Sequence, residues 1–201
     1  MYVGHIGIAL GAKGLRPRTW TPALVAAAVA CDVVQMALDL AGVNDKTQTY
    51  SHSVPAALVI AGVIAALYFA LTRRIHGAAF VAAVALSHLP ADYIAGRKLL
   101  WPDGPEVGLL LYDHYAADFA LEVAIIVLGW AAFRRTLRPR WRYSRLTWGL
   151  LATLVLGQLA FNYYDYRDDV ANDRAGPWWG GAPSAVVRIA RVGDGAHTRA
   201  E

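Results

Sequence analysis

Charged residues and cysteines are scarce in this chain of 201 residues. Only 17% of the residues are charged, whereas 57% are hydrophobic. This composition is too apolar for an ordinary soluble domain and is typical of a small polytopic membrane protein. The single cysteine, Cys31, lies within an apolar run, so the chain cannot form an intrachain disulfide and gives no indication of its redox compartment. The length requires no more than one domain.

Basic residues outnumber acidic residues by 19 to 15, but they form no basic stripe with interleaved aromatic side chains, which argues against nucleic-acid binding. They fall in short clusters between apolar runs, where membrane topology places positive charge. Eleven would share one side of the membrane: Lys13, Arg16, Arg18, Arg73, Arg74, Arg134, Arg135, Arg138, Arg140, Arg142 and Arg145. The opposite loops hold only Lys46, Arg97 and Lys98. The positive-inside rule therefore places the first set in the cytoplasm and the loops at 42–52 and 96–115 outside.

Five apolar segments have the length of about 20 residues that a membrane-crossing helix needs. They cover approximately residues 21–41, 53–71, 77–95, 116–133 and 146–164. A shorter apolar segment at 2–12 would rise only about 16 Å as a helix, against a hydrocarbon core of about 30 Å. We therefore expect an all-α integral membrane protein with about five transmembrane helices plus a short N-terminal re-entrant or interfacial helix. Residues 1–166 would form the membrane domain and 167–201 a partly disordered extracytoplasmic tail.

One short pattern occurs twice beside these apolar segments, as His88-x-x-x-Asp92 and His114-x-x-x-Asp118. Residues four apart on a helix lie on one face, about 40° apart, so each pair can close on one ion. Imidazole and carboxylate groups are common ligands of zinc and similar divalent metals. Ionisable groups within membrane segments are costly and are usually functional. The repeated pattern therefore indicates a metal site.

Three more ionisable residues lie at a similar predicted depth: His5, Asp32 and His52. With the orientation given above, all of these groups can meet in the outer half of one bundle, in a cavity that opens to the outside. Asp39 and Glu122 are expected to line this cavity or to support the ligands. The cations Arg97 and Lys98 lie at its rim, where they would bind a phosphate group of the substrate.

The order His5, Asp32, Ser51-His52-Ser53 and His88-x-x-x-Asp92, followed by Trp101-Pro102, resembles the predicted metal-dependent hydrolases of bacterial inner membranes. That family is similar in turn to the zinc-dependent phospholipases C and the single-strand nucleases, which are all-helical and hold up to three zinc ions. The resemblance implies metal roles for His5, Asp32, His52, His88, Asp92, His114 and Asp118. The chain departs from this pattern twice, because no Trp begins it and no His lies between Asp92 and His114. We therefore expect one or two ions.

These observations predict a hydrolase of the bacterial inner membrane that uses a divalent metal, zinc before others. It would cleave a phosphoester of a membrane lipid or lipid-linked substrate from the extracytoplasmic side, with Asp32 or Asp118 orienting the water or taking its proton. Two alternatives stay open. A metal-ion or proton-coupled transporter also uses buried His and Asp, and a non-catalytic membrane scaffold would hold a structural metal in a closed shell of ligands.

Overall fold

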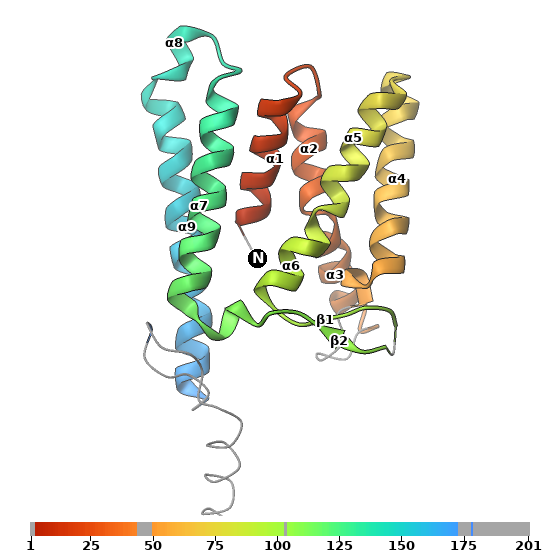
Figure 1. Ribbon diagram of the computed structural model, residues 1–201, viewed down its shortest axis with the longest axis vertical. Coiled ribbons are helices and arrows are strands. Elements are labelled where there is room, and N and C mark those ends of the chain that lie inside the picture. Colours follow the sequence, from red (N-terminus) through yellow and green to blue (C-terminus); the bar gives the residue numbers. More distant parts are fainter. Residues whose placement is uncertain (1–2, 44–49, 103, 173–177, 179–201) are drawn as a thin grey trace, which may run out of the picture.

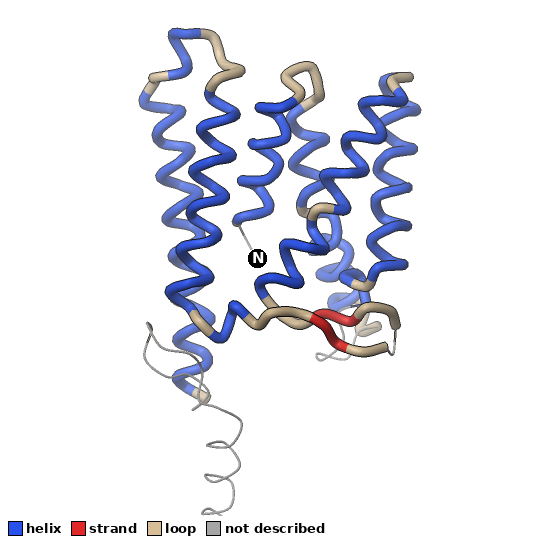
Figure 2. The backbone as a smooth tube through the Cα atoms, in the orientation of Figure 1, coloured by secondary structure: helices blue, strands red, loops and turns tan. Residues whose placement is uncertain are grey.

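The computed structural model describes residues 3–43, 50–102, 104–172 and 178, and helices dominate this part of the chain (Figures 1 and 2). The helices are α1 (Gly4–Leu15), α2 (Thr21–Ala28), α3 (Ala30–Leu40), α4 (Val54–Thr72), α5 (Ile75–Leu86), α6 (His88–Ala95), α7 (Tyr115–Arg134), α8 (Pro139–Arg142) and α9 (Arg145–Ala171). Two short 3-10 turns, η1 (Tyr50–His52) and η2 (Leu111–Asp113), precede α4 and α7. Strands β1 (Lys98–Leu99) and β2 (Glu106–Val107) pair antiparallel. The predicted all-α fold is confirmed, with this small hairpin added.

Four helical stretches are long and apolar enough to cross a membrane: Val54–Thr72, Ile75–Ala95, Tyr115–Arg134 and Pro139–Ala171. The pair α2 and α3 would make a fifth span, although it is bent by 54° at its break. Four to five spans agree with the sequence prediction, except that the segment at 21–41 was expected to be one continuous helix. The last helix continues to Ala171, so the predicted boundary at residue 166 falls inside it.

Connections rich in arginine gather at one end of the bundle. The α1–α2 loop, the α4–α5 turn and helix α8 lie together at the top of Figure 1, whereas β1, β2 and the start of α7 lie at the bottom. The separation of charge on which the predicted orientation depends is therefore present in the fold. Lys46 and the tail residues 173–177 and 179–201 lie outside the described residues.

Helix α1 lies within the bundle, where it packs mainly against α7 and α2 (Figure 1). The contact with α7 is close because glycines face each other. A Cβ atom at Gly7 would lie 2.8 Å from the Ile126 Cα atom, and one at Gly129 would lie 1.9 Å from the Gly7 carbonyl oxygen. Small residues allow helix backbones to approach in this way. The 12-residue α1 is therefore a buried half-length helix, as a re-entrant segment would be, and does not lie on the bundle surface.

Candidate metal centre

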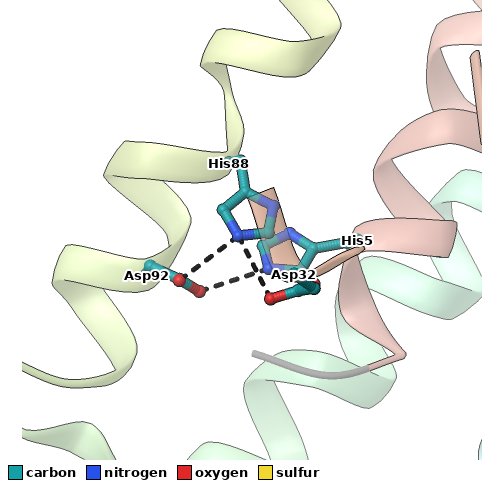
Figure 3. A group of neighbouring side chains, drawn as sticks. All are labelled: His5, Asp32, His88 and Asp92. Carbon is teal, nitrogen blue, oxygen red and sulfur yellow. Dashed lines mark hydrogen bonds and ion pairs between the residues drawn. The ribbon is translucent and has the colours of Figure 1, made fainter. Parts of the chain in front are cut away.

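Three histidines and two aspartates meet in the interior of the bundle. His5 of α1, Asp32 of α3, and His88 and Asp92 of α6 offer ligand atoms that all lie within 4.8 Å of one another (Figure 3). His52 of η1 joins them, since its Nε2 atom lies 3.1 Å from Asp92 Oδ2 and 3.1 Å from His88 Nε2. The structure thus brings together five of the seven ligands proposed from the sequence. We call these five side chains the His–Asp group.

The spacing of these atoms matches that of ligands around one small ion. His5 Nε2 lies 3.2 Å from Asp92 Oδ1, and His52 Nε2 lies 3.3 Å from Asp32 Oδ1. His88 Nε2 lies 3.5 Å from Asp32 Oδ1 and 3.4 Å from Asp92 Oδ2. Ligand atoms at about 2.0–2.1 Å from zinc and at tetrahedral angles are separated by about 3.3–3.4 Å. The group therefore has donor types and a spacing that could hold a metal ion.

Hydrogen bonds outside the group fix the ring nitrogens of two of its histidines. His88 Nδ1 lies 2.8 Å from the Ala28 carbonyl oxygen, which can only accept. Nδ1 therefore carries a proton, and in the neutral form of the ring the Nε2 lone pair of His88 faces the group. This leaves one nitrogen of His88 ready to bind a metal without any rearrangement of the ring.

His52 is oriented by a chain of three hydrogen bonds. The Ser51 hydroxyl donates to Gln35 Oε1 at 2.7 Å, and Gln35 Nε2 donates to Asp39 Oδ1 at 3.0 Å. Since the Ser51 hydrogen is committed to Gln35, its oxygen accepts from His52 Nδ1 at 2.9 Å. The His52 Nε2 lone pair is then free to face the group. Asp39 lies at the exposed outer end of this chain of hydrogen bonds.

Two helix breaks carry these residues inward. Pro90 cannot donate to the Leu86 carbonyl and its ring crowds that position, so the helix is interrupted at Ser87 and restarts at His88. No Pro or Gly residue near Val29 predicts the break there. There the carbonyl of Ala28, which would bond Asp32 N–H in a continuous helix, faces His88 Nδ1 instead. Side-chain bonding to a freed carbonyl allows irregular backbone at this depth.

Asp32 is the exposed member of the His–Asp group in the described part of the chain. The side chains of His5, His52, His88 and Asp92 are at most 4% exposed, whereas that of Asp32 is 42% exposed. On another side the Lys98 ammonium lies 3.9 Å from Asp92 Oδ2. Arg97, the other predicted phosphate-binding residue, is exposed at the bundle end. Asp32 therefore marks the route by which water or a substrate would reach the group.

The second His-x-x-x-Asp pair lies elsewhere. Asp118 is buried on α7, where its Oδ2 atom accepts from Asn162 Nδ2 of α9 at 2.9 Å, and His114 is exposed just before α7 begins. Neither residue belongs to the group of possible ligands found among the described residues. The spacing correctly placed His114 and Asp118 on one helix end but could not show which neighbour they face. Glu122 lies one turn further along α7 and accepts from the Gly4 backbone N–H at 3.0 Å.

Polar side chains that were not predicted from the sequence hold the start of α1. Gln158 Oε1 on α9 accepts from the Val3 backbone N–H at 3.0 Å, and Gln158 donates in turn to Asn162. Both α9 residues are buried, four positions apart in an apolar helix. That spacing was the available signal, because paired polar residues on one face of an apolar helix need partners. Val3 and Gly4, which precede His5, are thus held by Gln158 of α9 and Glu122 of α7, and these bonds help to position His5.

Comparisons with protein-family models, with curated proteins and with solved structures give no match to this chain. The indications of function therefore come from the geometry and chemistry of the His–Asp group.

Proposed function

We propose that this protein is a membrane-embedded hydrolase that uses a divalent metal, zinc before others, to cleave a phosphoester of a lipid or lipid-linked substrate. One observation carries the proposal: the ligand atoms of His5, Asp32, His88 and Asp92 all lie within 4.8 Å of one another, with His52 in contact with Asp92, and Asp32 is the exposed member of this set. A bound metal would supply Lewis acidity and a water whose pKa falls to about 7. The five side chains form one group, which favours one ion over two.

The residues of the group divide into two roles. Asp92 contacts all three imidazoles and is buried, so it serves to hold the metal. Asp32 is the exposed carboxylate and can orient the attacking water and take its proton. The water oxygen then bonds to phosphorus while the ester P–O bond breaks, and Asp32 can return the proton to the leaving oxygen. Lys98 is close enough to the group to bind a phosphoryl oxygen.

The position of the group in the bundle favours a lipid over a soluble substrate. Asp32, His88 and Asp92 belong to candidate membrane spans, and the group lies toward the end of the bundle opposite the arginine-rich loops. By the positive-inside rule that end is extracytoplasmic in a bacterial inner membrane. Phosphoester bonds of lipids lie at head-group depth, which makes a lipid or prenyl phosphate the substrate class that this site can reach.

The test combines metal analysis with a substrate panel. Protein purified in detergent without chelator should contain about one zinc per chain, and His88→Ala should lose it. Phospholipids and prenyl pyrophosphates would be incubated with wild-type protein, with chelator-treated protein and with His88→Ala. Head-group release by the wild type alone would support the proposal. Absence of metal from the wild type would overturn it, and bound metal without cleavage of any phosphoester would exclude the hydrolase.

The two helix breaks also favour a second candidate, a metal-ion or proton-coupled transporter. Transporter sites are often formed where discontinuous helices meet near the membrane midplane. The 54° break at Val29 and the local interruption at Ser87 within the Ile75–Ala95 stretch adjoin the His–Asp group. Proteoliposomes loaded with a zinc-sensitive dye distinguish the two functions. Zinc influx that depends on His88, without head-group release, would identify a transporter. A scaffold with a structural metal is less well supported, because the exposed edge at Asp32 leaves the shell open.

A further inference from the structure

A polar cavity lies between the start of α7 and the last turns of α9. Its volume is about 240 Å³. Six of the residues that line it carry side-chain oxygens suited to cations: Asp113, Asp118, Asn162, Asp165, Asp168 and Asp169. Among the described residues that line this cavity there is no Lys, Arg, His or Cys. The cavity therefore differs chemically from the His–Asp group, which is rich in imidazole.

Asp118 at the floor of the cavity shows that these carboxylates form more than a solvated acidic patch. The residue is only 1% exposed, and its Oδ1 atom has no hydrogen-bond partner in the described part of the chain. A buried carboxylate oxygen without a partner costs free energy, about 1–3 kcal/mol or more for a charged group. A cation bound in the cavity would remove this cost.

Neighbouring amides cannot supply the missing partner, because their orientations are fixed. The Val3 backbone N–H donates to Gln158 Oε1 at 3.0 Å, so Gln158 presents its N–H groups to Asn162 Oδ1. Asn162 must then present Nδ2 to Asp118 Oδ2, at 2.9 Å. This relay, anchored on a backbone N–H, holds the Asp118 carboxylate in place with Oδ2 bonded and Oδ1 left for a ligand.

We propose that this cavity binds a hard divalent cation, calcium before magnesium, at a site separate from the His–Asp group. Calcium takes six to eight oxygen ligands in flexible geometry, whereas magnesium demands a near-ideal octahedron. Carboxylates and water match the calcium preference, and a cavity of about 240 Å³ leaves room for several waters of about 30 Å³ each. The cavity lies at the bundle end that carries few arginines, which the positive-inside rule places outside the cytoplasm. Extracellular calcium sites have Kd values of about 0.1–1 mM, and we expect an affinity in this range.

The proposal is tested with terbium, a luminescent substitute for calcium, on full-length protein in detergent. Tyr115 lines the cavity and donates to Asp169 Oδ2 at 2.6 Å, so it can sensitise terbium emission at the site. Calcium should displace terbium with a Kd of about 0.1–1 mM. Asp118→Asn should weaken calcium binding at least about tenfold, which is about 1.4 kcal/mol, while the zinc content is retained. Asp39→Asn, which alters an exposed carboxylate outside the cavity, should leave the calcium affinity unchanged.

Three results would overturn the proposal. The first is that calcium up to about 10 mM displaces no terbium, and the second is that the wild type and Asp118→Asn bind calcium with equal affinity. The third is displacement of terbium by choline, a bulky monovalent cation, as effectively as by calcium. If Asp118→Asn fails to fold, Asp165→Asn decides the question, since its side chain is partly exposed. Weakening of calcium binding by about threefold or more in that variant supports the site, and an unchanged affinity contradicts it. The outcome is independent of the proposed hydrolysis, because terbium displacement and zinc content are measured without any enzymatic assay.

Discussion

Asp92→Asn should separate metal binding from folding in this protein. The substitution keeps the shape of the side chain and removes one negative charge. In the structure, the Asp92 carboxylate contacts His5 Nε2 at 3.2 Å, His52 Nε2 at 3.1 Å and His88 Nε2 at 3.4 Å, and it is 2% exposed. These contacts place Asp92 at the centre of the ligand set.

The size of the effect follows from this position. Mutation of a residue that merely orients a metal ligand typically lowers affinity 10–100-fold. Asp92 would itself bind the metal, so we expect a loss of at least about 100-fold, or about 2.7 kcal/mol. The fold should survive, because α6 is held by packing around Ala91 and Ala95 and by the bond between His88 and Ala28, which the substitution leaves intact.

A competition titration with a chromophoric zinc chelator measures the affinity, and circular dichroism of the same samples measures helix content. The matched control is Asp39→Asn, an exposed carboxylate seven residues after Asp32 that bonds Gln35. Its effect should stay below about threefold, because asparagine keeps an acceptor oxygen for Gln35 Nε2 and position 39 is exposed. If Asp92→Asn binds zinc within about threefold of the wild type, the carboxylate is not a ligand and the assignment of the His–Asp group as a metal centre fails.

Three further predictions concern the rest of the bundle. His114→Ala should leave the zinc content and affinity unchanged, because His114 is exposed and lies outside the His–Asp group; a loss of zinc measured by elemental analysis would contradict this placement. Gly7→Ala should destabilise the protein by about 1–3 kcal/mol, since its new Cβ atom would lie 2.8 Å from the Ile126 Cα atom. Gly62→Ala is the control, because its Cβ atom would meet nothing within 4 Å, and equal thermal unfolding midpoints for the two variants would refute the close packing of α1 on α7. A cysteine introduced at Lys46 should react with an impermeant reagent in intact cells, and labelling only after lysis would reverse the orientation inferred from the basic loops.

The helical fold and the convergence of His5, Asp32, His52, His88 and Asp92 could be predicted because both depend on spacing. Apolar segments of about 20 residues predict crossing helices. Alternating directions of successive spans then place these residues at one depth. Spacing of four residues also puts His88 and Asp92 on one helix face. These inferences need no knowledge of which helices are neighbours.

The surroundings of His114 and Asp118 and the helix break at Val29 depend on which helices are neighbours. They could therefore not be predicted from the sequence. Asp118 faces Asn162 of α9, and α1 packs tightly on α7 through Gly7 and Gly129. The break at Val29 arises in a run of Ala and Val residues with ordinary helix preferences, where tertiary contact with His88 overrides local sequence. The glycines at positions 7, 11 and 14 indicate that another helix packs closely against this segment, although they do not identify that helix.

The order of the residues along the chain bears on how the protein is made. Every member of the His–Asp group lies within the first 92 residues, whereas α7 and α9, which hold the start of α1 through Glu122 and Gln158, are synthesised afterwards. A nascent chain that has inserted only through α6 thus has all five side chains but lacks the two helices that fix His5. If the proposed metal binds this group, it could be loaded before α7 and α9 fix the centre, and a chain truncated before α7 would hold the metal with His5 loosely positioned.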